Sequence, residues 1–195
     1  VPVQRILGCL AYSSQERYSG AVEHIKGYLG NDNILYLSSG RAALWLYLKA
    51  LAQLRPDRKE VLVPADTCPS IVTAVLKAGL TPVLCDNNLD DFGYLGEDIE
   101  KKINRNTLAV IVVHLYGSPV KLEKIQALCR ANGTSLVEDA AQAFGNTFQN
   151  EQDVKLGLKG DAGFYSFGRG KPISIMHGGL LVIDDPDEYH EAWQI

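Results

Sequence analysis

Short apolar runs alternate with amphipathic segments through the middle of the chain. The apolar runs have the length and bounding turn residues of buried strands, and they lie at residues 61–64, 82–86, 108–115 and 135–138. The amphipathic segments repeat apolar residues at helical spacing, and they lie at residues 42–54, 70–78 and 121–132. Because strand and helix alternate, this region predicts a mostly parallel sheet with right-handed crossover connections.

The alternation changes in the last part of the chain. Residues 162–167 and 179–183 are strand-like runs, and only a loop with glycine and proline separates them. The sheet is therefore expected to be mixed, because neighbouring strands without a crossover helix need not be parallel. Residues 184–195 hold a turn and the beginning of a further helix. We expect an α/β fold, with a mostly parallel mixed sheet flanked by helices, in one domain over residues 1–195.

The segment at residues 42–54 has apolar residues on almost every side: Leu44, Trp45, Leu46, Tyr47, Leu48 and Leu51. A helix with this pattern is buried on most of its surface. It either belongs to the core of its own chain or contributes to a contact between two copies of the chain.

Composition and charge exclude several classes of partner. The 195 residues include 19 Lys and Arg against 23 Asp and Glu, and this mildly acidic balance is not that of a nucleic-acid-binding protein. No apolar run approaches the roughly 20 residues of a membrane-spanning helix, and no secretory signal pattern opens the chain. The cysteines form no CxxC pair and are Cys9, Cys68, Cys85 and Cys129. We expect a cytoplasmic protein without a nucleic-acid or membrane partner.

Common nucleotide, metal and hydrolase motifs are absent from the sequence. There is no GxxxxGK[ST] loop, and Gly168-Arg169-Gly170 lacks the third glycine of a dinucleotide fingerprint. The 4 histidines have no metal-ligand spacing, and no GxSxG elbow is present. These absences argue against a metal site and against a serine hydrolase.

The loop before residues 42–54 could bind a phosphate group. Ser38-Ser39-Gly40-Arg41 offers hydroxyls, a glycine and the first backbone N–H groups of the expected helix. Serine is also among the commonest N-cap residues, so the segment taken alone could be an ordinary helix cap.

Glu138 and Asp139 end an expected strand, and ligands of open parallel sheets bind beyond the carboxyl ends of the strands. Because side chains alternate along a strand, only one of the two carboxylates can face that crevice while the other faces a helix layer. The small residues that follow, Ala140 and Ala141, leave room for a flat ligand. An isolated Asp at this place can also be a turn or cap residue.

Lys171 follows another expected strand, in a loop whose glycines permit unusual backbone angles. A lysine forms Schiff bases with carbonyl cofactors when its amine is desolvated or lies beside another cation, and Arg169 is close in sequence. A loop lysine can equally be solvated and without a role. In this order, a phosphate loop, a strand-end Asp and a loop Lys are the parts that a pyridoxal 5′-phosphate (PLP) enzyme needs.

The sequence resembles the DegT/StrS-type sugar aminotransferases, which are fold-type I, PLP-dependent enzymes. The matching residues follow the family's order and are Ser39-Gly40-Arg41-Ala42-Ala43-Leu44, Val63-Pro64, Ala78-Gly79-Leu80-Thr81-Pro82-Val83, His114-Leu115-Tyr116-Gly117, Glu138-Asp139-Ala140-Ala141-Gln142, Gly160-Asp161-Ala162-Gly163, Ser166-Phe167, Lys171 and His177-Gly178-Gly179. The resemblance implies the three-layer, aspartate aminotransferase-like large domain of these enzymes. It also implies that the C-terminal small domain is missing, since the family's chains are about twice as long.

The resemblance implies ping-pong transfer of an amino group, from glutamate to a keto sugar carried on a nucleotide. Lys171 would form the Schiff base with the cofactor and later move the proton, and Asp139 would keep the pyridine nitrogen protonated. Gln142 would lie near the O3′ oxygen of the cofactor. The family's shared clefts also imply a homodimer.

The same resemblance implies the residues around the phosphate and the ring. Ser166 would bind the phosphate through its hydroxyl, and Gly40, Arg41 and Ala42 would offer it backbone N–H groups. Cys68 stands where many relatives have an aromatic residue that stacks on the pyridine ring.

Two alternatives to the aminotransferase remain open. A shortened homologue could keep the fold as a non-catalytic binding or regulatory module. Other members of the family are PLP-dependent sugar dehydratases, but these replace the lysine by histidine, and Lys171 argues against that reading. A further departure is Met176, which stands where the family usually has another glycine.

Overall fold

In the computed structural model, the chain forms two compact units, Val1–Asp32 and Asn33–Ile195, and the structure describes residues 15–88, 96–148 and 151–195. The first unit holds α2 (Gln15–Leu29), which ends at Gly30 with φ 69°. A glycine in this left-handed conformation is a common end of a helix. All the other described elements belong to the second unit.

The second unit is built on a seven-stranded sheet with the order β1-β9-β8-β5-β4-β2-β3. The strands are β1 (Ile34–Leu37), β2 (Glu60–Pro64), β3 (Thr81–Cys85), β4 (Thr107–Val113), β5 (Ser135–Asp139), β8 (Ala162–Ser166) and β9 (Gly179–Ile183). β3, β2, β4, β5 and β8 run parallel, whereas β9 is antiparallel to both β8 and β1. The predicted mixed, mostly parallel sheet is confirmed. A separate small hairpin pairs β6 (Thr147–Phe148) with β7 (Glu151–Lys155).

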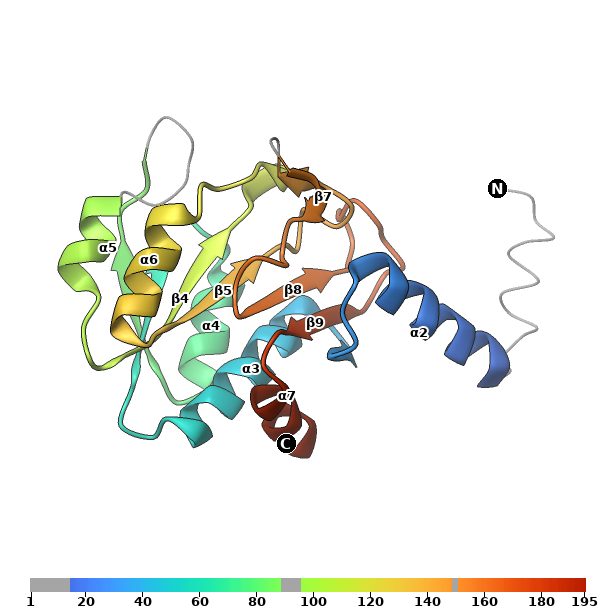
Figure 1. Cartoon of the computed structure of the whole chain (residues 1–195), viewed down its shortest axis with the longest axis horizontal. Coiled ribbons are helices and arrows are strands. Elements are labelled where there is room, and N and C mark those ends of the chain that lie inside the picture. The colour runs from blue at the N-terminus through green and yellow to red at the C-terminus, as the bar shows by residue number, and fades with distance from the viewer. Residues whose placement is uncertain (1–14, 89–95, 149–150) are drawn as a thin grey trace. The chain divides into compact units, whose positions relative to one another are not determined.

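Helices cover both faces of this sheet and make the predicted three layers (Figure 1). α3 (Gly40–Leu54) lies on one face, in contact with β8 and β9, and α4 (Pro69–Lys77) and α7 (Pro186–Gln194) pack against it. α6 (Glu123–Asn132) packs on β5 and, with α5 (Gly96–Lys102), covers the other face. No helix in the described part of the chain is both long enough and apolar enough to cross a membrane.

α3 is the centre of the main hydrophobic core. Leu44, Tyr47, Leu48 and Leu51 are at most 1% exposed and belong to one buried cluster with residues of the sheet, α4 and α7. The interpretation of residues 42–54 as core of its own chain is therefore confirmed. The reason is that α3 has sheet on one side and helices on the other.

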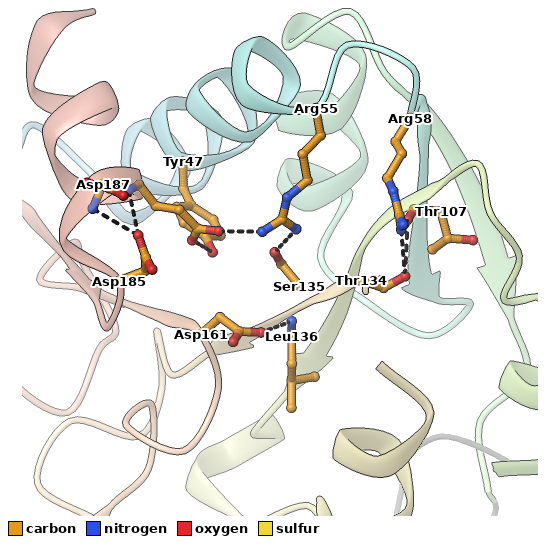
Figure 2. Close-up of polar contacts among 11 residues, drawn as sticks. Tyr47, Arg55, Arg58, Thr107, Thr134, Ser135, Leu136, Asp161, Asp185 and Asp187 are labelled. Atoms are coloured by element: carbon orange, nitrogen blue, oxygen red, sulfur yellow. Dashed lines mark hydrogen bonds and ion pairs between the residues drawn. The ribbon is translucent and has the colours of Figure 1, made fainter. Parts of the chain in front are cut away.

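A buried polar network fastens α7 to the rest of this core (Figure 2). The Tyr47 hydroxyl of α3 donates to Glu188 Oε2 of α7 at 2.7 Å. Arg55, just beyond α3, donates to Glu188 Oε1 at 2.7 Å and to the Ser135 hydroxyl of β5 at 2.8 Å. Burial raises the pKa of Tyr47 well above its usual range, and the neighbouring Glu188 carboxylate raises it further.

Most expected elements lie within two residues of the observed ones, with three informative differences. The strand expected at residues 108–115 ends at Val113, because Tyr116 has φ 54° and Leu115–Gly117 form a short 3-10 turn. α5 was not predicted, because Ile99 is its one buried residue and a single buried position leaves no helical period to read. β1 was also missed, since it is only four residues long.

Candidate active site

A pocket of about 240 Å³ lies at the carboxyl ends of β5 and β8. Its lining includes residues from α3, α4, β5, β8 and the loop between β8 and β9. Those that the sequence predicted are Gly40, Arg41, Cys68, Asp139, Ser166 and Lys171. Tertiary structure thus brings together segments that lie far apart in the sequence, at the edge of the sheet where ligands of open α/β folds bind.

One end of the pocket is formed by the first residues of α3 against the end of β8. Ser39 is the N-cap of α3, and its hydroxyl accepts the Ala42 N–H at 3.2 Å. A Cβ on Gly40 would lie 3.0 Å from the Ser166 Cβ and 3.2 Å from the Tyr165 carbonyl oxygen. Glycine therefore allows the positive end of the helix dipole to start directly beside the Ser166 hydroxyl.

Glycines also join the start of β9 to this helix end. The Gly178 N–H donates to the Ser38 carbonyl at 2.9 Å. A Cβ on Gly179 would collide with the Ser39 carbonyl carbon and would lie 2.5 Å from the Gly40 nitrogen. The glycine pair is therefore required so that β9 can pass the loop that begins α3.

Two expectations differ in detail from what the structure shows. The Ala42 N–H is already bound to the Ser39 hydroxyl, so in this structure it is not a free donor for a ligand, and Ala42 does not line the pocket. Gln142 does not line the pocket either, and its Oε1 accepts the Tyr116 N–H at 2.8 Å. The reason is local in both cases. A free backbone N–H in the first turn of a helix or in a left-handed turn forms a hydrogen bond with a nearby side-chain oxygen, here that of Ser39 or Gln142.

Asp139 lines the pocket, is 7% exposed, and accepts the Ala141 N–H on Oδ1 at 2.8 Å. Its second oxygen accepts no hydrogen bond from any described residue. Burial raises the pKa of Asp139 to about 6, although the Ala141 N–H and the positive charge of Lys171 lower it in part. A buried carboxylate with one unused oxygen in a pocket is suited to accept a proton donor of a ligand.

Lys171 reaches the same pocket from the loop between β8 and β9. Its backbone N–H donates to the Gly168 carbonyl at 3.3 Å, and the Gly168 N–H lies 3.4 Å from the Ser166 hydroxyl. This turn holds the lysine close to the end of β8. In the described ranges 15–88, 96–148 and 151–195, no carboxylate forms an ion pair with Lys171.

Met176 lies later in the same loop with φ 76°, a left-handed conformation that favours glycine. Its side chain is 50% exposed, so the backbone conformation is not compensated by burial of the side chain. The position at which the sequence departs from the family's glycine is therefore a strained one.

Sequence reasoning missed several residues of the lining. Phe164 lies two positions before Ser166 on β8, so the alternation of strand faces could have indicated it. Ser70 and Ile71 belong to the first turn of α4, next to Cys68, and no pattern in the sequence marked them as facing a pocket. The Ser70 hydroxyl lies 3.1 Å from the Cys68 sulfur.

Other reactive groups do not form a second centre in the parts of the chain that the structure describes. No cluster of three His, Cys, Asp or Glu residues there could hold a metal ion. Cys68, Cys85 and Cys129 are free thiols, and Cys9 lies outside the described residues.

Comparison with known proteins agrees with this arrangement. Residues 14–195 match the DegT/DnrJ/EryC1/StrS aminotransferase family. The chain belongs to this family. It is 35% identical to GDP-perosamine synthase of Escherichia coli O157:H7 over 153 residues, which are 78% of this chain and 41% of that enzyme.

Two matches from Helicobacter pylori extend the comparison. The chain is 30% identical over 172 residues to UDP-4-amino-4,6-dideoxy-N-acetyl-beta-L-altrosamine transaminase, covering 86% of this chain and 44% of that enzyme. The solved structure of PseC, an aminotransferase involved in the biosynthesis of pseudoaminic acid, has a TM-score of 0.85 at 26% identity. That match covers 97% of this chain and 51% of PseC. The chain thus has the DegT/DnrJ/EryC1/StrS fold and spans about half the length, or less, of these relatives.

Proposed function

We propose that this chain is the PLP-binding large domain of an aminotransferase that acts on a nucleotide-linked keto sugar. The observation that carries the proposal is the meeting of Lys171, Asp139 and the α3–β8 end in one pocket. Each of these features taken alone is weak evidence for a cofactor site, but together they match the amine, the acid and the anion site that PLP requires. The printed names of the relatives, perosamine synthase and an altrosamine transaminase, support sugar amination.

The residues of the pocket fit PLP. The N-terminus of α3 with Gly40 and Arg41, together with the Ser166 hydroxyl, suits the phosphate. The unused oxygen of Asp139 suits a protonated pyridine nitrogen, and the Lys171 amine suits the aldehyde. Cys68 lies at the N-terminus of α4, where it contributes a small, polarizable wall to the ring site. Gln142 remains a proposal for the O3′ oxygen, for which its side chain would have to leave the Tyr116 N–H.

Each residue has a separate task in the proposed reaction. PLP, when bound, supplies an electron-withdrawing ring that stabilises negative charge at the amino-bearing carbon of the substrate. Asp139 holds the proton on the ring nitrogen, for which a buried carboxylate is well suited because water does not compete with it. The Lys171 amine takes a proton from the amino-bearing carbon of the donor and returns it in the second half of the reaction.

The proposal includes a donor, a partner copy and a compartment. The amino donor is glutamate, and the acceptor is a nucleotide-linked keto sugar. Lys171 favours transfer over the dehydratase alternative, because that chemistry in the family uses histidine in its place. The remainder of the substrate pocket would come from a C-terminal small domain and from a second subunit of a homodimer in the cytoplasm.

Trapping of the cofactor tests the proposal directly. Incubation with PLP followed by borohydride should fix one phosphopyridoxyl group per chain on Lys171, because only a lysine held in the pocket forms the reducible bond efficiently. Peptide mapping by mass spectrometry measures the site. Lys171→Ala should abolish the modification, whereas Lys121→Ala, at an exposed position, should leave it unchanged. Modification that survives Lys171→Ala at full yield would contradict the assignment, and a chain that binds no PLP at all would favour the non-catalytic alternative.

The proposed dimer has its own test. The loop between β8 and β9 exposes the apolar side chains of Ile175 and Met176, at 67% and 50%. Light scattering should give twice the 21.3 kDa of one chain. Ile175→Asp should shift the protein to monomer, whereas Leu76→Asp, at an equally exposed position of α4, should not. A parent chain that stays monomeric at micromolar concentration would rule out an obligate shared site.

A further inference from the structure

Behind the candidate site lies a buried acid and histidine that the proposed reaction does not use. Glu138 and His114 both have side chains that are 0% exposed, and His114 Nε2 lies 2.7 Å from Glu138 Oε2. The alternation of side chains along β5 puts Glu138 on the opposite face from Asp139, as the sequence predicted for one of the two carboxylates. The expectation that this second carboxylate faces a helix layer was wrong. Glu138 instead faces the turn that precedes β8.

Glu138 accepts hydrogen bonds on both oxygens. Oε1 accepts the N–H groups of Lys159 and Gly160, each at 2.6 Å. Oε2 accepts the Gly157 N–H at 3.0 Å in addition to the contact with His114. Since every partner is a donor, the site requires a group that only accepts, and an ionised carboxylate is the side chain that meets this requirement.

The hydrogen bonds also determine the tautomer of His114. Its Nδ1 accepts the Val120 N–H at 3.2 Å, so this nitrogen carries no proton. The Nε2 nitrogen must then carry the hydrogen and donate it to Glu138. The imidazole is therefore a neutral link with one fixed orientation.

His114 also binds the backbone of Asp139. The His114 N–H donates to the Asp139 carbonyl at 3.0 Å, while its side chain holds Glu138. The Ala140 N–H donates to the Phe164 carbonyl at 3.0 Å. The end of β5 is thus held on both sides of Asp139, so the direction of the Asp139 carboxylate depends on hydrogen bonds of the backbone around it.

We propose that Glu138 and His114 are positioning residues for Asp139, acting through the end of β5 to aim its free oxygen into the pocket. The inference rests on the proposed role of Asp139 toward PLP. The protein surrounds Glu138 with four donors but gives Asp139 one, from Ala141. The arrangement keeps one carboxylate for structure and leaves the other for a ligand.

Two substitutions of His114 separate its two side-chain bonds. His114→Gln places an amide N–H near the position of Nε2, so it keeps the bond to Glu138 and loses the bond from Val120. His114→Asn places an oxygen near the position of Nδ1, so it keeps the bond from Val120 and loses the bond to Glu138. Both variants lose one hydrogen bond and the edge-on contact with Phe148, so a general loss of stability should be similar in the two.

The expected difference between them is in the site. His114→Gln should bind PLP within about threefold of the parent chain, and His114→Asn should bind it at least about tenfold more weakly, because a buried carboxylate that loses a donor pulls the strand end out of place. Absorbance titration with PLP measures both dissociation constants. Equal affinities in the two variants would overturn the proposal.

A readout without PLP keeps the test independent of the proposed function. Carbon NMR of the Asp139 carboxyl group should show a changed titration midpoint in His114→Asn and the parent midpoint in His114→Gln. An unchanged midpoint in both would overturn the positioning role. If Asp139→Asn itself did not weaken PLP binding, the proposed function would fail, while the NMR comparison would still decide whether His114 and Glu138 position Asp139.

Glu138→Gln provides a second route to the same conclusion. The amide NH2 group would take the place of one carboxylate oxygen and would face either the Gly157 N–H and the His114 Nε2–H or the N–H groups of Lys159 and Gly160, so at least one donor pair would repel. If the variant folds, it should resemble His114→Asn in PLP affinity and in the Asp139 titration. Parent-like values in folded Glu138→Gln would contradict the proposal.

Discussion

Replacing Asp139 with asparagine should stabilise the PLP-free chain at pH 8. Burial raises the pKa of this carboxyl group to about 6, above its ordinary value of 3.8 in the unfolded chain. Such a group favours the folded state fully below pH 4, and this contribution is lost as the pH rises through about 6. At pH 8 the ionised, buried carboxylate therefore costs roughly 3 kcal/mol, by the 1.36 kcal/mol that correspond to each pKa unit.

Urea unfolding of the parent and of Asp139→Asn, at pH 8 and at pH 4.5, measures this difference. The gain should be largest at pH 8 and should fall to roughly a third of that value at pH 4.5, where the folded carboxyl group is mostly protonated but the unfolded one is still mostly ionised. Asparagine keeps an oxygen for the Ala141 N–H, so the local turn is preserved. Asp57→Asn, at an exposed turn position, should change the free energy of unfolding by less than about 0.5 kcal/mol at either pH.

The same substitution should weaken the proposed function. Without the negative charge, the ring nitrogen loses its partner, so PLP binding should weaken and amino transfer should fall much more steeply. Stability and function would thus change in opposite directions, as is typical of a residue selected for a site rather than for the fold. A variant that is less stable at both pH values would instead identify Asp139 as a turn residue.

Glu188→Ala should lower the free energy of unfolding by about 3 kcal/mol, the range found when one partner of a buried ion pair is removed. Glu188 is 6% exposed and accepts from both Tyr47 and Arg55, which Figure 2 labels. Its removal takes away the acceptor that lies 2.7 Å from the fully buried Tyr47 hydroxyl and leaves the Arg55 guanidinium without its carboxylate. α7 should consequently detach from α3 before the rest of the unit unfolds.

Chemical unfolding and amide hydrogen exchange of α7 check this prediction. Asp187→Ala is the matched control, because Asp187 lies on the same helix but is exposed, and its effect should stay below about 1 kcal/mol. Tyr47→Phe combined with Glu188→Ala should cost less than the sum of the two single changes, since both remove the same bond. Fully additive losses, or a loss below about 1 kcal/mol for Glu188→Ala, would contradict the network as the main anchor of α7.

Local patterns in the sequence determined most of the sheet and indicated the candidate site. The apolar period of residues 42–54 predicted a buried helix, and α3 is one, because a helix without a polar face has no stable place in water. Strand runs at residues 61–64 and 179–183 lie within one residue of β2 and β9. The order of Gly40, Asp139 and Lys171 along the chain indicated a PLP site, because few other cofactors need a glycine, an acid and a lysine in this order.

The sequence also determined that one of Glu138 and Asp139 faces the crevice, since that follows from the pleat of any strand. Which of them does so depends on which face of β5 meets α3, and a single strand carries no information about that. The core cluster with α3 includes Val137, so Asp139 shares its face and Glu138 does not. The sheet had to be assembled before the two carboxylates could be told apart.

Other features belong to the tertiary structure alone. The pairing of His114 with Glu138 and the use of the Ala42 N–H by Ser39 depend on distances that the spacing of residues does not encode. The same is true of β1, whose four residues become a strand because they pair with β9 at the opposite end of the chain. Sequence period reports how a segment is buried, whereas the partner of each buried polar group is decided only when distant segments meet.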